Sequence, residues 1–345
     1  MILASEASVI RQAAGLIKKG ELVAFPTETV YGLGADAANP QAVAKIFAVK
    51  QRPFFDPIIV HVESPQAASS LWSNCPPLAE ELMQAFWPGP LTIVLPKTDR
   101  IPDIVTAGLP SVGLRMPAHP VAMELIKQSG TPLAAPSANR FGCSSPTTAE
   151  AVSEELGESV SLIIDGGPAK VGIESTVVTL EEGQLIILRP GGVTAEALKK
   201  IAGFVAIRER QARPASPGMF DRHYAPATPL YLLWNPNEPF NAPSAARKII
   251  GPIGVICLTP VALPVEVASM EVLSQAGDLT EAAANFFQAL RRLDKQGLKA
   301  IIGIPMPMAG LGLALMDRLK RASSGLAVLY PTHVEIIESP PLLTR

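Results

Sequence analysis

The chain has 345 residues, 48% of them hydrophobic and 17% charged, which supplies enough apolar surface for two domain cores and excludes an intrinsically disordered protein. The formal net charge of -2 disfavours a general nucleic-acid binder, because such proteins hold the phosphate backbone with an excess of basic residues. Cysteines stand at 75, 143 and 257, odd in number and far apart, so we expect no disulfide framework, no zinc knuckle and a reducing cytoplasm. The first residues lack a basic start followed by a long apolar stretch, and prolines interrupt the most apolar segments. We therefore expect neither a signal peptide nor a membrane span.

The first two-thirds of the chain mix helices and strands. In chain order, the apolar patterns predict a helix over 6–19, a strand over 22–25, a helix from 40 to about 50, a strand over 58–62, a helix over 77–86, strands over 91–95 and 112–116, a helix over 120–129, a strand over 133–135, a helix over 147–156, and strands over 162–165, 175–179 and 185–189. Because helices and strands do not strictly alternate, a twisted mixed sheet fits better than a doubly wound parallel one.

The second helix is expected to end at a pair of cations. Asn39 and Pro40 are typical of a helix start, as N-cap and first helical residue. Pro53 biases Arg52 towards an extended backbone, so the helix should stop near Lys50. If the chain is extended there, Lys50 and Arg52 share one face and could clamp a phosphate. The alternative is that both cations only offset the helix dipole.

The composition changes after residue 203. Residues 213–218, Arg-Pro-Ala-Ser-Pro-Gly, are turn-rich and predict a linker between two domains. Beyond it, the pattern predicts strands over 230–233 and 254–258, a helix over 279–296 with Asp278 as N-cap, a strand over 300–304 and a helix over 312–322. The expected fold class is α/β. It comprises a twisted, mixed open sheet with helices over 1–204, a linker over 205–228, and a smaller Rossmann-like βαβ domain over 229–345.

Polar groups also follow the strand predicted over 133–135. Ser137 and Asn139 supply a hydroxyl and an amide at the end of a strand, where the sites of α/β proteins often lie. The alternative is an ordinary turn, because Pro, Ser and Asn all favour turns.

Two arginines, Arg115 and Arg189, lie in otherwise apolar strands. A charge there is costly unless it is paired, so each should meet either a carboxylate of the fold or an anionic ligand. His61 lies alone in a strand, and no second His or Cys stands at metal-ligand spacing, so no metal site is expected. No phosphate-binding glycine motif and no G-x-S-x-G motif occurs. The residues alone indicate a basic, partly apolar pocket for an anionic small molecule.

Seven segments, taken together and in order, are more specific than any one of them. They are AFPTETVYGLGADA (24–37), KIFAVKQRP (45–53), WPGPLTIVL (87–95), VGLRMPAHP (112–120), PLAAPSANRFG (132–142), IESTVV (173–178) and LRPGG (188–192). In this combination the first 205 residues resemble the YrdC-like family, the threonylcarbamoyl-AMP synthases. HYAP at 223–226 and GLGLALMDRLKRAS at 310–323 resemble the linker and C-terminal domain of the family's long, two-domain form.

The resemblance implies an enzyme that joins L-threonine, bicarbonate or CO2, and ATP into L-threonylcarbamoyladenylate and pyrophosphate, for the modification of adenosine 37 in tRNA. It implies as catalytic residues Lys50, Arg52, Ser137 and Asn139. It implies as nucleotide-binding residues Arg52, Asp56, Ser111, Ala135, Ser137, Arg189 and Tyr224, the last in a linker lid. It implies as threonine-binding residues Thr29, His61, Arg115 and Ser175, with Arg115 on the substrate carboxylate. ATP is expected to carry Mg²⁺ without a dedicated metal site. The product is expected to pass to a tRNA threonylcarbamoyltransferase complex, without a membrane or stable binding of tRNA.

The chain departs from the family pattern at two places. Asp56 stands where the family usually has an asparagine, and a carboxylate only accepts hydrogen bonds and would repel a phosphate. Phe220-Asp221-Arg222 replaces a more basic run ahead of HYAP. Three alternatives stay open: the same chemistry on another acceptor, an RNA-binding protein with a local basic groove, and a non-catalytic family member.

Overall fold

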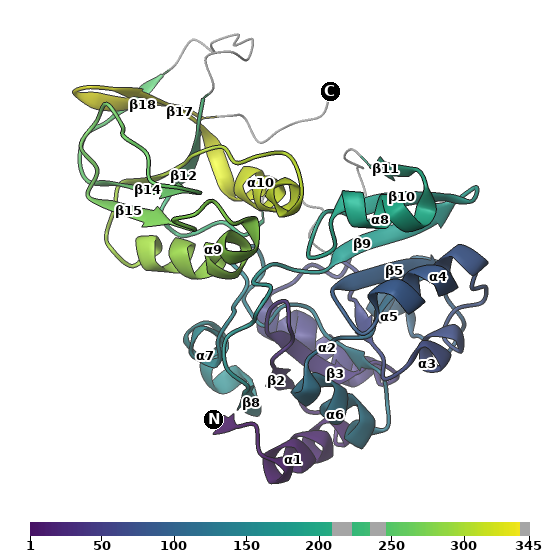
Figure 1. The fold of residues 1–345 in the computed structure, drawn as a ribbon. Coiled ribbons are helices and arrows are strands. Elements are labelled where there is room, and N and C mark those ends of the chain that lie inside the picture. Colours follow the sequence, from purple (N-terminus) through teal and green to yellow (C-terminus); the bar gives the residue numbers. More distant parts are fainter. Residues whose placement is uncertain (209–222, 235–245, 339–345) are drawn as a thin grey trace. The chain divides into compact units, whose positions relative to one another are not determined.

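The computed structural model describes residues 1–208, 223–234 and 246–338, which fall into two units, each built on its own β-sheet (Figure 1). The first unit is assigned Met1–Phe141 and Ser145–Met219, and the second Gly142–Ser144 and Phe220–Arg345. The turn-rich residues 213–218 and the run Phe220-Asp221-Arg222 lie outside the described residues. The domain boundaries expected at 204 and 228 stay predictions.

The first unit has an 11-stranded sheet, with the strand order β1-β8-β2-β3-β7-β4-β6-β5-β9-β10-β11. Its strands are β1 (Ile2–Ala4), β2 (Val23–Phe25), β3 (Gly32–Asp36), β4 (Val60–His61), β5 (Leu91–Pro96), β6 (Ser111–Arg115), β7 (Leu133–Ala134), β8 (Leu162–Asp165), β9 (Thr176–Glu181), β10 (Gln184–Arg189) and β11 (Val205–Ile207). Some neighbours are parallel, such as β4 and β6, and others antiparallel, such as β5 and β6. The mixed sheet expected from the sequence is confirmed.

Three strands of this sheet were not expected: β1, β3 and β11. Strand β3 was missed because Gly32 and Gly34 have little propensity for β-strands. Glycine is nevertheless needed at position 34, because a Cβ there would lie 2.7 Å from the ring of Phe25. Strand β11 forms a parallel ladder with β10, so residues 205–207, the first residues of the expected linker, extend this sheet at its edge.

The helices of the first unit begin and end close to their predicted bounds. They are α1 (Ala7–Lys18), α2 (Pro40–Lys50), α3 (Pro65–Ser69), α4 (Pro77–Phe86), α5 (Asp103–Thr106), α6 (Pro120–Ser129), α7 (Ala149–Leu156) and α8 (Ala195–Ala202), with a 3-10 turn at Gly157–Ser159. The Asn39 side chain caps α2 as predicted, accepting from the backbone N–H groups of Gln41 and Ala42. The short helices α3 and α5, and α8, were not predicted.

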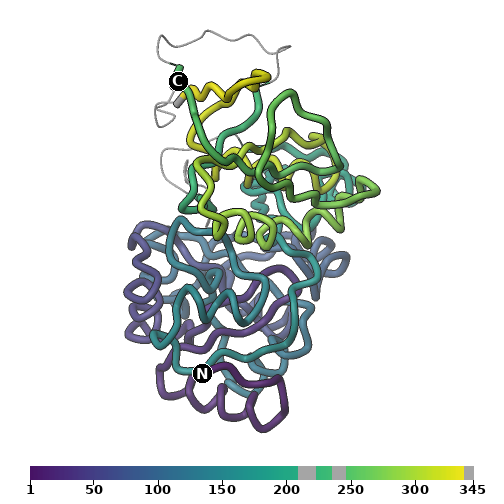
Figure 2. Tube along the Cα trace, turned by 90° about the vertical axis from the view of Figure 1, so that its left-hand side faces the viewer, coloured from purple at the N-terminus to yellow at the C-terminus, as the bar shows by residue number. Residues whose placement is uncertain are grey.

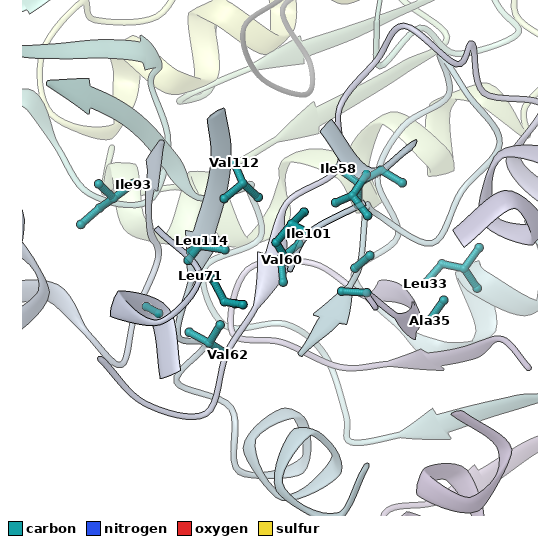
Figure 3. Close-up of a cluster of buried hydrophobic side chains, with 14 of the residues drawn as sticks. Leu33, Ala35, Ile58, Val60, Val62, Leu71, Ile93, Ile101, Val112 and Leu114 are labelled. Carbon is teal, nitrogen blue, oxygen red and sulfur yellow. The ribbon is translucent and has the colours of Figure 1, made fainter. Parts of the chain in front are cut away.

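Apolar helix faces cover both sides of the first sheet. Val23 and Phe25 of β2 belong to one core cluster and Ala24 to the other, because side chains alternate along a strand. Helices α1 and α6 pack on the first side, and α1 lies with the edge strand β1 at one end of the unit (Figures 1 and 2). Helix α2 packs on the second side, whose cluster includes Leu33, Val60 and Leu114 (Figure 3).

The second unit has a 7-stranded sheet, with the strand order β13-β18-β17-β12-β16-β14-β15. Its elements are β12 (Leu230–Leu233), β13 (Arg247–Ile249), β14 (Ile253–Cys257), β15 (Ser269–Val272), α9 (Leu279–Asp294), β16 (Ala300–Gly303), α10 (Leu311–Ala322), β17 (Ser323–Tyr330) and β18 (His333–Glu338). The five strands from β17 to β15 are parallel, as expected of a βαβ domain, whereas β18 and β13 add antiparallel pairs that were not predicted. Asp278 caps α9 as predicted. In the described parts of the chain, no helix combines the length and the apolar character that crossing a bilayer requires.

Candidate active site

Lys50 is the last residue of helix α2, and its ammonium group is buried against the loop of residues 137–139. Only 1% of Lys50 is exposed, and Nζ donates to the carbonyl oxygens of Ser137 and Asn139, each at 2.5 Å. The loop is tied further by the hydrogen bond from Phe141 N to Lys50 O at 2.8 Å. The two motifs expected to form one centre are therefore in direct contact, and the 137–139 segment is more than an ordinary turn.

The backbone between the two cations is not extended, contrary to the expectation. Gln51 has φ 52° and ψ 39°, in the left-handed region, because it ends helix α2. The alternate-face argument for Lys50 and Arg52 was therefore wrong. Both cations are nevertheless buried, so they are not merely exposed charges that offset the helix dipole.

Arg52 is held by the loop that follows it. Its Nη2 lies 2.7 Å from Asp56 Oδ2 and donates to Pro57 O at 2.7 Å, while Nε donates to Asp56 O at 3.2 Å. Asp56 is fully buried. Burial raises the pKa of Asp56 to about 6, although Arg52, Lys50 and Arg189 all lower it. Asp56, the residue expected to repel phosphate, is thus close to Lys50, Arg52 and Arg189, the cations expected to attract it.

Arg189 ends β10 beside a pair of hydroxyl groups. Its Nη2 donates to the backbone oxygen of Ser175 at 2.9 Å and to Ser175 Oγ at 3.3 Å. The hydroxyl of Thr92, on β5, lies 2.8 Å from Ser175 Oγ. A Cβ on Gly191 would lie 2.4 Å from the backbone of residues 174–176, so glycine is needed for this close approach. Thr92 was missed, because its pairing depends on β5 and β9 being neighbours.

Arg115 ends β6 and meets a carboxylate of the fold as well as a hydroxyl group. Nη2 lies 2.6 Å from Glu28 Oε1, Nη1 donates to Thr29 Oγ1 at 2.9 Å, and Nε donates to Gly89 O at 3.2 Å. Glu28 Oε2 accepts from Ala118 N at 3.0 Å. A guanidinium has five N–H groups, so two remain for a ligand once these contacts with described residues are counted.

Glu28 is the second residue that sequence reasoning missed. The signal was present, since Glu28 is a carboxylate inside the largely apolar segment 24–37, and Arg115 required a partner. The two residues are 87 positions apart, and only the fold brings them together.

His61, on β4, is paired in register with Arg115 on the neighbouring strand β6. Burial, and after it the charge of Arg115, lowers the pKa of His61 to about 3, so the imidazole is neutral at physiological pH. The ring packs edge-on against Phe25, with centroids 6.2 Å apart. Nδ1 is buried, and no hydrogen-bond partner for it occurs in the described residues. Thr29, His61 and Arg115 thus form one cluster.

The remaining predicted residues are spread over both units. Ser111 begins β6 and is half-buried, while Ala135 follows β7 and donates from its backbone to Ile59 O at 3.0 Å. Tyr224 belongs to the second unit, where it is buried against Phe287, with centroids 5.5 Å apart. Most of the expected lid, 209–222, lies outside the described residues. The roles of these residues stay predictions.

No cluster of three or more His, Cys, Asp and Glu side chains that could hold a metal ion occurs in residues 1–208, 223–234 and 246–338. The side chains described at the site are buried cations, the carboxylates that pair with them, hydroxyl groups and a neutral imidazole. These groups suit anionic ligands and the neutralisation of charge that develops in a reaction.

Comparison with known proteins identifies the family of the chain. A family model described as "Telomere recombination" matches residues 15–191, and one described as "Threonylcarbamoyl-AMP synthase, C-terminal domain" matches residues 193–324. The threonylcarbamoyl-AMP synthase of Pyrococcus abyssi is 41% identical over 332 residues, which cover 91% of this chain and 94% of that protein. The one of Bacillus subtilis is 40% identical over 325 residues, covering 92% and 94%.

The solved structure of P. abyssi Sua5 complexed with L-threonine matches the fold. Its TM-score is 0.85 at 38% identity, and the match covers 96% of this chain and 98% of that one. The regions that both family models match are therefore represented in the relatives. The chain belongs to the threonylcarbamoyl-AMP synthase family, in its two-domain form.

Proposed function

We propose that this protein is an L-threonylcarbamoyladenylate synthase, which condenses L-threonine, bicarbonate or CO2, and ATP into threonylcarbamoyl-AMP and pyrophosphate. The observation that carries the proposal is Arg115, which is buried, oriented by Glu28 and Thr29, and left with two N–H groups for a ligand. Among the described contacts, one of these N–H groups remains on Nη1 and one on Nη2, and a carboxylate can accept from both nitrogens of a guanidinium. The names of the relatives and the L-threonine in the P. abyssi structure support the same assignment.

In this proposal the cluster of Thr29, His61 and Arg115 binds threonine, together with Ser175, which the structure places beside Arg189 and Thr92. Arg115 holds the substrate carboxylate. The neutral imidazole of His61 does not add a second positive charge beside Arg115, and the hydroxyl groups offer hydrogen bonds to the polar groups of threonine.

The nucleotide is proposed to bind at the cations that act on Asp56, which are Lys50, Arg52 and Arg189. The family resemblance assigns the other residues of the nucleotide-binding and catalytic sets, which are Asp56, Ser111, Ala135, Ser137, Asn139 and Tyr224. An oxygen of the threonine carbamate attacks the α-phosphorus, the bond from this phosphorus to the bridging oxygen breaks, and pyrophosphate leaves. No protein nucleophile is needed, so Lys50 and Arg52 act by position and by neutralising charge on the phosphates. Mg²⁺ would enter with ATP, held by its phosphates, and supply further charge neutralisation there.

The product is proposed to pass to a tRNA threonylcarbamoyltransferase complex that modifies adenosine 37, so stable binding of tRNA by this chain is not needed. The cytoplasm, where tRNA and ATP are abundant, is the proposed location.

The test is product formation by the purified full chain with Mg²⁺, ATP, bicarbonate and L-threonine. We expect pyrophosphate release and a product with the mass of threonylcarbamoyl-AMP, both lost when any substrate is omitted. Supplying each other amino acid in turn tests the acceptor. Product with another acceptor and none with threonine would refute the threonine assignment. Tight, salt-dependent RNA binding on filters without ATP turnover would favour the RNA-binding alternative instead.

A further inference from the structure

Asp56 occupies an unusual position for a carboxylate in a site proposed to hold a polyphosphate. It is fully buried, and Oδ2 is paired with Arg52 Nη2 at 2.7 Å. Oδ1 is equally buried, and no hydrogen-bond donor for it occurs in the described residues. The charged groups that act on it are Lys50 from the end of α2, Arg52 from the segment after α2, and Arg189 from β10. Asp56 therefore serves as the counter-anion of the proposed phosphate site.

A polyphosphate would compete with Asp56 for these three cations. An ionised carboxylate can only accept hydrogen bonds, so it offers nothing to a phosphate oxygen and repels it. A protonated carboxyl group has the size and shape of the asparagine amide that the family usually has here, and its O–H can donate to phosphate. One proton would thus convert the least suitable residue of the site into a ligand.

Binding of ATP supplies the driving force for this conversion. Burial already disfavours the charged form of Asp56, and attraction by the three cations opposes burial. When phosphates neutralise those cations and add negative charge, burial and repulsion by the phosphates both favour the neutral form of Asp56. We propose that Asp56 takes up one proton when ATP binds and then donates a hydrogen bond from its carboxyl group to a phosphate oxygen. This inference rests on the proposed function, because it places ATP at these cations.

The proposal has a direct thermodynamic consequence. Burial sets the pKa of Asp56 at about 6 before ATP binds, so above that pH the proton must come from solvent. The affinity for ATP should then fall by up to about tenfold per pH unit above pH 7, because one proton is taken up per ATP bound. Asp56→Asn should bind ATP with little dependence on pH in that range, because the amide donates at every pH.

The experiment is isothermal titration calorimetry of the full chain with Mg-ATP, without threonine and bicarbonate so that no turnover occurs. It is run at pH 8 in buffers of different ionisation enthalpy, which gives the number of protons taken up, and the dissociation constant is measured from pH 7 to 9. We expect the wild type to take up about one proton more than Asp56→Asn. Asp103→Asn is the matched control, because Asp103 also pairs with a cation, Lys97 at 3.1 Å, outside the site. It should behave like the wild type.

The outcomes distinguish failure of the proposed proton uptake by Asp56 from failure of the proposed synthase function. Equal proton uptake by wild type and Asp56→Asn, with ATP bound by both, overturns the proton uptake and leaves the proposed function standing. If Asp56→Asn does not fold, the wild type alone decides, because a dissociation constant unchanged between pH 7 and 9 contradicts the proposal. Absence of ATP binding and of pyrophosphate release in the wild type overturns the proposed function and this proposal together.

Discussion

Glu28 Oε1 lies 2.6 Å from Arg115 Nη2, and both side chains are buried at the ends of segments 87 positions apart. The second carboxylate oxygen of Glu28, Oε2, accepts a hydrogen bond from Ala118 N, so Glu28 ties the Arg115 guanidinium to the backbone that follows β6. Glu28 is therefore a positioning residue, which sets the direction of the two N–H groups left on Arg115.

Glu28→Gln should raise the KM for threonine about tenfold and leave the KM for ATP nearly unchanged. Glutamine keeps one acceptor oxygen but loses the charge, and a hydrogen bond to a charged group contributes about 1.5–3 kcal/mol. Steady-state kinetics with each substrate varied will separate the two constants. Glu21→Gln is the control, because Glu21 forms a surface pair with Lys45 at 2.9 Å that should contribute little. Equal changes in both KM values would indicate a merely structural role.

Lys50→Met should lower pyrophosphate release by about a hundredfold or more, since it removes a buried charge at the proposed phosphate site. It should also lower the free energy of unfolding by about 1–3 kcal/mol, because the carbonyls of Ser137 and Asn139 lose their shared donor. Lys45→Met, in the same helix but half-exposed, should retain activity. Normal turnover by Lys50→Met would refute the site.

Thr92→Val should raise the KM for threonine several-fold while costing about 1 kcal/mol of stability. The change keeps the side-chain shape but removes the hydroxyl that orients Ser175 Oγ at 2.8 Å. Thr106→Val is the matched control, because the Thr106 hydroxyl donates to Leu109 O at 2.9 Å away from the site. Its stability should fall similarly with no change in KM. An unaltered KM for Thr92→Val would exclude Thr92 from the threonine site.

The stability of the wild type should fall between about pH 4 and pH 6 relative to Asp56→Asn. Burial raises the pKa of Asp56 from 3.8 to about 6, so the folded state holds a proton in that range that the unfolded state has lost. The unfolded state binds fewer protons, and the free energy of unfolding therefore decreases as pH rises, by up to about 3 kcal/mol across the window. Urea unfolding of both proteins from pH 4 to 8 will measure the difference. A constant difference would contradict the raised pKa.

Gly191→Ala should lower both stability and activity, with a cost of about 1–3 kcal/mol for the crowding. The new Cβ would lie 2.4 Å from backbone atoms of residues 174–176 and would push the segment carrying Arg189 away from Ser175. Gly15→Ala provides the opposite control, because nothing lies within 4 Å of its Cβ in helix α1. That change should raise stability by up to about 1 kcal/mol. Thermal unfolding and pyrophosphate release will check both variants.

Expectations that depend on local signals agree closely with the structure. Helices α4 and α6 have their predicted bounds, and Asn39 and Asp278 cap their helices. Expectations about segments whose backbone conformation has no clear signal in the local sequence agree less well with the structure. Gln51 is left-handed where an extended chain was expected, and β3 and β11 were missed because glycine-rich or short segments have little strand propensity.

The sequence by itself determined the fold class and the two-domain family, and it supplied the residues proposed for the site, because apolar periodicity, capping and the order of the motifs are all properties of short segments. Only the tertiary structure decided which groups those residues meet. Glu28 reaches Arg115, Thr92 reaches Ser175, and Lys50 reaches two backbone carbonyls, each through the order in which distant segments lie side by side. The environment of Asp56 was decided in the same way, because burial and the charges around a carboxylate depend on packing and not on its neighbours in the chain.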